Sequence, residues 1–229
     1  MKTIFSILFS LSFLFNYGQA INKKTSVKID SILQIVGSQE GNELLKSYEE
    51  LSKLYIGNKP EVAIQYIDSL YTESINSNNL KYSTKAEIMR AFYLMEKAEL
   101  KKAEALYLKH IPVLDSLNLG PDVASAYSML GVTQMQIGNF DSALDSQLKA
   151  LRKAQSLEYS DNKLAGFYLN LAGVYMHVGK SDLAIDYLEQ AETAYINSNN
   201  KPGLMRVKAN IAMIQLRKKD YQNLLQCKF

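Results

Sequence analysis

The sequence repeats itself, and the repeat is long enough to hold two helices. The pentapeptide INSNN occurs at residues 75–79 and again at residues 196–200, so the two copies start 121 positions apart. An alanine lies twelve positions before each copy, and two further alanines divide the interval into nearly equal steps of 40, 40 and 41: Ala63, Ala103, Ala143 and Ala184. A fixed period of roughly 40 residues is typical of a solenoid, in which each structural unit packs only against its neighbours.

Inside each unit the apolar residues follow the three-or-four alternation of a buried helix face. Two such stripes follow one another in the best-defined unit: Val123, Tyr127, Leu130 and Ile137, then Phe140, Leu144, Leu148 and Leu151. Gly138 and Asn139 stand between the stripes and suit a helix end in the left-handed conformation. Each unit is therefore predicted to be a pair of antiparallel helices.

Proline and asparagine mark the joints between units. Pro60, Pro121 and Pro202 each stand where a new helix is expected to begin, a position that tolerates the missing N–H of proline. The INSNN segment is predicted to be the end of a second helix, where asparagine adopts a positive φ and helps to cap the last carbonyl groups.

Two units carry a pattern of large, small and turn residues that resembles the tetratricopeptide repeat (TPR) family. In residues 127–151 the pattern consists of Tyr127, Leu130, Gly131, Gly138, Phe140, Ala143 and Ala150. In residues 168–191 it consists of Leu171, Ala172, Tyr175, Gly179, Ala184 and Ala191. The period exceeds the standard TPR length of about 34 residues. It is similar to the long-period TPRs in the N-terminal extracytoplasmic regions of bacterial signalling proteins. Gln134 and Gln147 depart from the pattern, because they stand at sites that are usually apolar or aromatic.

The resemblance implies an all-α fold, a right-handed solenoid of antiparallel helix pairs (a TPR-like superhelix). Small residues are expected where the two helices of a unit cross, because a larger side chain would push the helices apart. These repeat-packing positions, with the turn glycines, are Ala63, Ala91, Ala103, Gly131, Gly138, Ala143, Ala172, Gly179, Ala184 and Ala212.

The first twenty residues are typical of a secretory signal peptide. Lys2 precedes an apolar run from Ile4 to Phe15, and small or polar residues lead to Ala20. A helix over that run would rise about 18 Å, which is less than the roughly 30 Å hydrocarbon core of a bilayer. We therefore expect cleavage after Ala20 (signal peptide 1–20), export to a periplasmic or other extracytoplasmic compartment, and no membrane span in the mature chain.

The remaining chain is predicted to hold a leading cap helix with a linker at 21–41 and a TPR solenoid at 42–229. The solenoid divides into four full repeats and an incomplete fifth: 42–80, 81–120, 121–160, 161–201 and 202–229. In the fifth unit a first helix is expected near 203–218, followed by a second helix that ends after nine residues. That layout leaves the last apolar face open, and self-association through this face is one expectation for the chain.

The composition argues against several function classes. The chain has 26 basic and 23 acidic residues, a formal charge of +3, and it lacks the dense basic stripe of a nucleic-acid surface. It contains no P-loop, dinucleotide fingerprint or nucleophile elbow. Neither His110 nor His177 stands at a convincing metal-ligand spacing, and the single Cys227 cannot form an internal disulfide. We therefore expect no enzymatic activity, no cofactor, no metal and no nucleic-acid partner.

In the TPR family the first helices line a groove that receives a peptide. The corresponding positions here are Tyr48, Ser52, Tyr55, Ile88, Phe92, Met95, Ser128, Val132, Met135, Leu169, Met176, Ala209 and Met213. This candidate groove is apolar and rich in methionine, which suits an amphipathic or hydrophobic segment of a partner. The alternative interpretation is that these side chains pack against neighbouring helices.

Two hypotheses on function follow. The first is an exported, non-enzymatic TPR scaffold that mediates protein–protein or peptide interaction through the candidate groove. The alternative is the extracytoplasmic sensor portion of a truncated or fragmentary signalling protein, of the histidine kinase or transcriptional regulator type.

Overall fold

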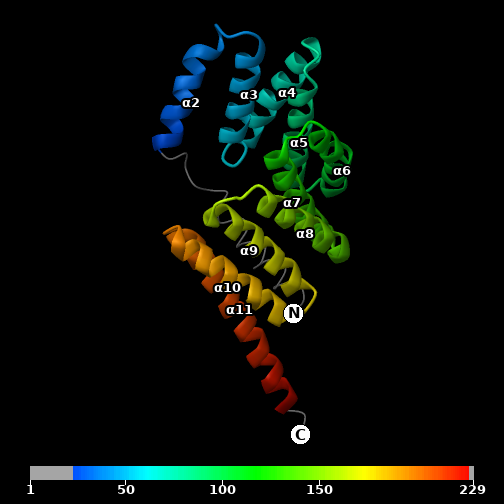
Figure 1. Cartoon of the computed structure of the whole chain (residues 1–229), viewed down its shortest axis with the longest axis vertical. Helices are drawn as coiled ribbons and strands as arrows, with labels where there is room; N and C mark the ends of the chain where they lie inside the picture. The colour runs from blue at the N-terminus through cyan, green and yellow to red at the C-terminus, as the bar shows by residue number, and fades with distance from the viewer. Residues whose placement is uncertain (1–22, 227–229) are drawn as a thin grey trace. The chain divides into compact units, whose positions relative to one another are not determined.

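The computed structural model describes the backbone of residues 23–226 and the side chains of residues 23–217 (Figure 1). The predicted signal peptide and Cys227 lie outside the described residues. The described part forms ten α-helices in sequential antiparallel pairs: α2 (Lys23–Val36), α3 (Gly41–Tyr55), α4 (Pro60–Asn76), α5 (Leu80–Glu96), α6 (Leu100–Ser116), α7 (Gly120–Ile137), α8 (Phe140–Ser156), α9 (Asp161–His177), α10 (Ser181–Asn197) and α11 (Lys201–Gln226). The predicted all-α architecture of helix pairs is confirmed.

The repeat period has a simple structural origin. From α4 to α10 the helices have 17 residues, except α7 with 18, and most of the joints between them have three. One helix with its joint therefore fills half of the period, and a helix pair fills all of it. Pro60 and Pro121 occupy the first turns of α4 and α7, and Pro202 is the second residue of α11, as predicted.

Each joint from α4 onward contains one residue with a left-handed backbone. These residues have φ between +49° and +92°: Asn78, Ala98, Asn118, Gly138, Glu158, Gly179 and Asn199. In the two INSNN copies, the N–H of Asn79 donates to the carbonyl of Ser74 at 2.7 Å, and the N–H of Asn200 donates to that of Tyr195 at 2.9 Å. Because these bonds satisfy carbonyls of the last helical turn, the predicted role of INSNN as a joint is confirmed.

The last asparagine of INSNN also connects the joint to two helices. The Asn200 side chain accepts the N–H of Gly203 at 2.9 Å, in the first turn of α11, and its amide donates to Asn162 of α9 at 2.6 Å. Asn79 repeats both contacts, with the N–H of Tyr82 at 3.3 Å and with Asn42 of α3 at 2.9 Å. The repeated pentapeptide therefore reflects a repeated hydrogen-bond network.

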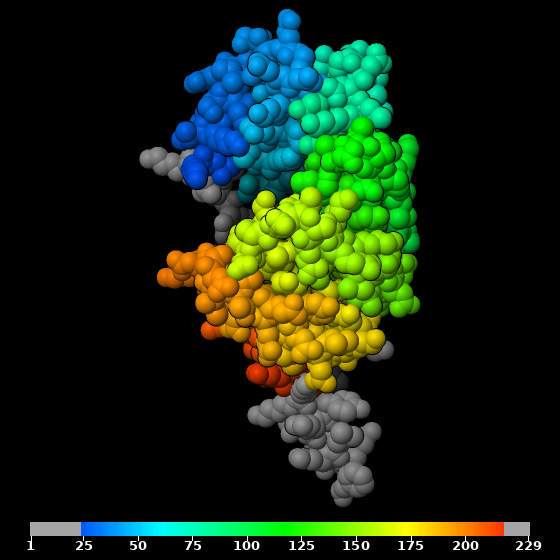
Figure 2. All heavy atoms as spheres, in the orientation of Figure 1, coloured from blue at the N-terminus to red at the C-terminus, as the bar shows by residue number. Residues whose placement is uncertain are grey.

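The chain divides into two compact units between Leu106 and Tyr107, within α6. In the first unit α2 packs on α3, α3 on α4 and α5, and α4 on α5, around a core that includes Leu45, Ile67 and Leu70. In the second unit α7 to α11 pack in chain order, with α7 also against α9. The side chains of α9 and α10 form adjoining bands on the surface of this unit (Figure 2).

The structure places most of the small repeat-packing residues in the interior. Seven are buried: Ala63, Ala91, Ala103, Gly131, Ala143, Ala172 and Ala184. Gly138 and Gly179 are exposed turn residues with φ of +92° and +76°. Gly131 lies close to the second helix of its pair, because a Cβ built on it would lie 2.7 Å from Nε2 of Gln147.

Gln147 and Gln134, the two departures from the TPR pattern, are buried and hydrogen-bonded. The Gln147 amide donates to the carbonyl of Ser128 at 2.9 Å, and its carbonyl oxygen accepts from the Ser128 hydroxyl at 3.4 Å. Gln134 accepts from the hydroxyl of Ser146 at 2.7 Å. A buried polar group lowers stability only a little when its hydrogen bonds are made. The helices α7 and α8 therefore still pack as a pair, although polar side chains lie between them.

The fifth unit differs from the expectation. α11 continues unbroken from Lys201 to Gln226, so the predicted turn into a short second helix is absent. Residues 217–222 (RKKDYQ) contain neither glycine nor asparagine, the left-handed residues in five of the seven joints from α4 onward, and this favours continuation of the helix. Ala212 consequently has no partner helix to cross among the described residues and lies exposed, which corrects its assignment as a repeat-packing position.

The close approach at Gly131 yields a stability prediction. We expect Gly131→Ala to lower the free energy of unfolding by about 1–3 kcal/mol, because the new methyl group overlaps the buried Gln147 side chain. The matched control is Gly166→Ala in α9, where a Cβ has open space; it should raise stability by up to about 1 kcal/mol through helix propensity. Urea unfolding followed by circular dichroism measures both, and equal effects would contradict the proposed contact.

A second prediction concerns the left-handed joints. Glu158 adopts a φ of +49° at an exposed position, and a left-handed conformation costs an L-residue about 1–2 kcal/mol, partly offset by the greater chain entropy of glycine. We expect Glu158→Gly to raise the free energy of unfolding by about 0.5–1 kcal/mol. Gln155→Gly, three residues earlier in exposed helix, should lower it by a similar amount. Thermal and urea unfolding of the two variants would separate these outcomes.

Candidate functional site

The predicted groove residues fall into three classes of exposure. Tyr48, Tyr55, Ile88, Phe92, Met135 and Met213 are half-buried. Ser52, Met95, Ser128, Val132, Leu169 and Met176 are buried. Ala209 is exposed. The six buried residues therefore do not line an open surface, which corrects their placement in a groove.

The burial has a clear cause in how the first helices pack. First helices touch one another in each unit, α3 against α5 and α7 against α9. Ser128 of α7, for example, lies in this contact, because its hydroxyl accepts from the Asn170 amide of α9 at 3.0 Å. For these residues the alternative interpretation of packing against neighbouring helices holds. Tyr55, although half-buried, stacks on Tyr66 of α4 with ring centroids 5.8 Å apart.

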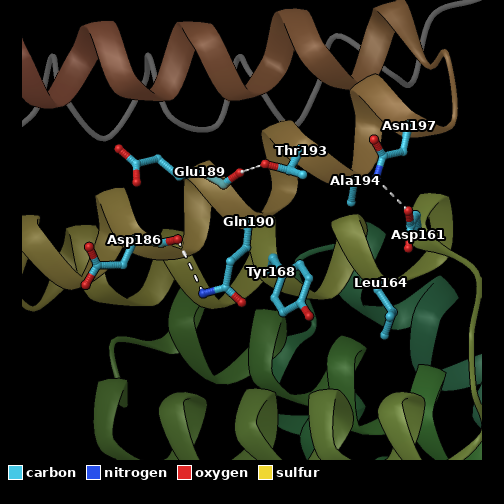
Figure 3. Close-up of a pocket in the computed structure, with 9 residues that line it drawn as sticks. All are labelled: Asp161, Leu164, Tyr168, Asp186, Glu189, Gln190, Thr193, Ala194 and Asn197. Atoms are coloured by element: carbon cyan, nitrogen blue, oxygen red, sulfur yellow. Dashed lines mark hydrogen bonds between the residues drawn. The ribbon is translucent and has the colours of Figure 1, made fainter.

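A hollow between α9 and α10 is a concave site that the sequence did not reveal (Figure 3). It has a volume of about 420 Å³ and is lined by Asp161, Leu164, Tyr168, Asp186, Glu189, Gln190, Thr193, Ala194 and Asn197. The Asn197 amide donates to Asp161 at 3.0 Å and so joins the two helices at one end. Tyr168 packs against Tyr187 of α10, with ring centroids 6.3 Å apart. We refer to this site as the α9/α10 hollow.

The preceding pair carries a hollow at equivalent positions. This α7/α8 hollow has a volume of about 350 Å³ and is lined by Asp115, Val123, Tyr127, Lys149, Arg152, Lys153 and Ser156. Six of these residues stand 41 positions before a residue of the α9/α10 hollow: Val123, Tyr127, Lys149, Arg152, Lys153 and Ser156 correspond to Leu164, Tyr168, Gln190, Thr193, Ala194 and Asn197. The hollow is therefore a repeated feature of the helix pair, with a tyrosine in each copy.

The two hollows differ in charge. The α7/α8 hollow presents Lys149, Arg152 and Lys153, and Asp115 pairs with Lys153 at 2.8 Å. Asp145 accepts a hydrogen bond from Lys149 at 2.7 Å, and this contact raises the pKa of the lysine.

The α9/α10 hollow presents carboxylates instead. Asp161, Asp186 and Glu189 line it, and no lysine or arginine does. Within the described residues, neither Asp186 nor Glu189 forms an ion pair. Two adjacent copies of one backbone site thus offer opposite charges to a partner.

The signal for these hollows was present in the sequence, but it was not specific. Tyr127 and Tyr168 stand at equivalent positions of successive repeats, and both lie within the TPR-like pattern, where a large residue is expected for packing. Only the positions of the second-helix side chains around them identify an open site.

Residues 23–217 contain no group of three His, Cys, Asp or Glu side chains that could hold a metal ion. His177 stacks on Phe140 with ring centroids 5.5 Å apart, and burial, followed by the positive charge of Arg217, lowers its pKa. None of the helices in this part of the chain is both long and apolar enough to cross a membrane.

Glu49 is a buried carboxylate in the first unit and is held by two lysines. Lys53 lies 2.5 Å and Lys85 lies 3.0 Å from the same oxygen, and Lys85 links α5 to α3. Burial alone would raise the pKa of Glu49, but the hydrogen bonds and charges of the two lysines outweigh it and hold the pKa below its ordinary value. The contact between Glu49 and Lys85 thus links the adjacent first helices α3 and α5.

Comparisons with known proteins identify the fold but not the family. No family model matches the chain, and no curated protein sequence matches it either. Among solved structures, aspartyl phosphate phosphatase F from Bacillus subtilis matches with a TM-score of 0.71 and 10% identity, over 95% of this chain and 61% of that one.

Two further matching structures contain a tetratricopeptide repeat sensor or a bound peptide. A signal transduction ATPase of the STAND type from Pyrococcus horikoshii, with a tetratricopeptide repeat sensor, has a TM-score of 0.66 and 15% identity, over 81% of this chain and 30% of that one. NprR in complex with its cognate peptide NprX has a TM-score of 0.62 and 14% identity, over 90% of this chain and 60% of that one.

These likenesses establish a TPR-like fold. The chain spans less than two thirds of each of the three structures.

The ion pair at Glu49 predicts a pH dependence. Because the pKa of Glu49 is lower in the folded than in the unfolded chain, its contribution is complete above about pH 4.5 and is lost as the pH falls through the folded pKa. We expect Glu49→Gln to lower the free energy of unfolding at pH 7 by about 1–3 kcal/mol, since the half-buried Lys85 loses its charged hydrogen-bond partner. The variant should also lose less stability than the parent between pH 5 and pH 3. Urea unfolding across this range measures both.

Glu50→Gln is the matched control for this experiment. Glu50 is more exposed and pairs with Lys28 at 3.5 Å on the surface, so its removal should change stability by less than about 0.5 kcal/mol. A Glu49→Gln variant with an unchanged acid profile would contradict the assigned pKa direction.

Proposed function

We propose that this protein is an exported, non-enzymatic scaffold that binds a polypeptide segment of a protein partner. The observation that carries the proposal is the repeated hollow, at the same positions of two successive helix pairs, with opposite charge in the two copies. A polypeptide suits two neighbouring hollows of opposite charge, because it presents side chains of different charge at regular distances along one chain.

The contact would combine apolar burial with charge selection. Tyr127 and Tyr168 supply apolar surface, whose burial contributes roughly 25 cal/mol per Å² before ordering costs are subtracted. An acidic side chain of the partner suits Arg152 in the α7/α8 hollow, and a basic one suits Asp186 and Glu189 in the α9/α10 hollow. Charge complementarity of this kind contributes mainly to specificity and association rate.

The likeness to NprR in complex with its cognate peptide supports the same class of ligand. The half-buried groove positions of the first unit, Tyr48, Ile88 and Phe92, form a second surface for such a segment. Export is proposed from the signal-like residues 1–20.

One observation favours a second candidate function, the sensor portion of a larger signalling protein. The STAND structure combines a tetratricopeptide repeat sensor with an ATPase, and this chain spans 30% of it. In that case the peptide-binding role would be unchanged, and the output activity would lie in another part of the protein.

Selection of peptides from a random display library on the immobilised full chain tests the binding role. We expect enriched peptides that carry both an acidic and a basic residue, and Asp186→Lys combined with Glu189→Lys should weaken their binding at least tenfold. Asp141→Lys is the matched control, because Asp141 is exposed on α8 and lines neither hollow. Phe92→Glu tests whether the candidate groove contributes to peptide binding. A library that yields no enriched peptide would overturn the proposal.

The size and location of the native product separate the two candidate functions. An immunoblot of periplasmic and membrane fractions should show a free scaffold as a band near the mass of residues 21–229. A much larger, membrane-bound band would instead assign the chain to the sensor portion of a signalling protein.

A further inference from the structure

α11 carries apolar residues on two opposite faces. On one face Val207 and Ile214 are 0% and 2% exposed and belong to the core that also contains Leu188 of α10. On the other face Met205 and Leu216 are 73% and 63% exposed. Two exposed alanines lie between them, so the exposed stripe consists of Met205, Ala209, Ala212 and Leu216. Steps of four, three and four residues place the four side chains in one line along a helix.

The same line of residues is fully covered in α9. The residues 40 positions earlier are Ala165, Leu169, Ala172 and Met176, and they are at most 6% exposed. They share a core cluster with Ala184, Leu188 and Ala191 of α10, the second helix of that pair. The exposed stripe of α11 is therefore the surface that receives a second helix in the preceding repeat.

None of the described helices fills this position on α11, since all four residues of the stripe are exposed in residues 23–217. α11 itself continues to Gln226 without turning back toward the stripe. Ala209 and Ala212 at the centre leave room for the close approach of another helix, because small residues let two backbones pack near each other.

Charge indicates which helix would fit. Residues 201–217 contain four basic residues and no acidic one. With 100° per residue, Lys208 lies on one side of the stripe and Arg206 lies on the other. The helix that covers the equivalent surface in α9 has the opposite character, because residues 181–197 of α10 contain four acidic residues and no basic one: Asp182, Asp186, Glu189 and Glu192.

We propose that the exposed stripe of α11 is a docking site for an amphipathic helix of a partner protein, with acidic residues beside its apolar face. The partner helix takes the position that a second helix occupies in the complete repeats. This interface is separate from the hollows and shares only Ala209 with the predicted groove positions, so it goes beyond the proposed function. A second copy of the chain fits less well, since it would bring two basic helices together. A lipid surface also fits less well, because membrane-binding helices present bulky apolar residues where this stripe has alanine.

A labelled synthetic peptide with the sequence of residues 181–197 is the probe for this site. Fluorescence anisotropy with the full chain should show saturable binding in the micromolar range. A peptide in which the four acidic residues are replaced by lysine should bind at least tenfold more weakly. Absence of binding by the first peptide, or equal binding by both, would overturn the proposal.

Two variants of the full chain locate the interface. Ala212→Glu places a carboxylate at the centre of the stripe and should weaken binding of the acidic peptide at least tenfold. Gln155→Glu introduces the same charge at an exposed position of α8, away from the stripe and its basic flanks, and it should change binding less than threefold. Circular dichroism of both variants checks that the exposed substitutions leave the fold intact. Equal losses would show that the peptide responds to net charge alone and would overturn the proposal.

Two further measurements test the other occupants. Sedimentation equilibrium that shows a dimer, lost in Ala212→Glu, would assign the stripe to a second copy. Retention on vesicles of phosphatidylcholine and phosphatidylserine in a 3:1 ratio, lost in the same variant, would assign it to an anionic membrane. Either result would overturn the proposal of a protein partner at the exposed stripe. Failure of peptides to bind at the hollows would leave both measurements unchanged.

Discussion

The two helices of each pair approach closely at a small residue, and the rest of the structure depends on that contact. Ala63, Ala143, Ala172 and Ala184 are all 0% exposed at these crossings. At Gly131 the approach is so close that even a methyl group would meet Gln147. Close pairing aligns the two helices along their length, so that every pair uses about the same number of residues and the next pair begins in the same register. The joints from α4 onward maintain this register with one left-handed residue each.

The candidate binding sites also belong to the helix pair. Side chains of both helices surround a hollow at equivalent positions in α7/α8 and α9/α10. The backbone determines that a hollow is present, whereas the second-helix side chains determine its charge. Lys149 and Arg152 in one pair correspond to Gln190 and Thr193 in the next. A solenoid of this kind can therefore change the specificity of one unit without changing the packing of its neighbours.

The candidate site was less predictable than the fold. Phe92 and Met135 remain half-buried at predicted groove positions, but Leu169 and Met176 are buried in the core of the second unit. A single helix pattern shows that a residue is apolar and on a given face, but burial of that face depends on the neighbouring helices. Ala212 illustrates the converse. It follows the small-residue period, yet it is exposed, because no second helix of the described residues returns to cross α11.

The sequence by itself determined the number and order of the helices from α2 to α10, the places where they end and the residues at which they cross. These features depend on local chemistry and on the repeat period, both of which are visible in one chain: Pro60 and Pro121 at helix starts, Asn78 and Asn199 in the joints, Ala143 and Ala184 at the crossings. Only the tertiary structure decided which apolar positions are accessible, where the hollows lie and that α11 continues as one helix with an exposed stripe. Accessibility is a property of several helices at once, because the side chains that cover or surround a residue come from other helices, some of them a whole repeat away along the chain.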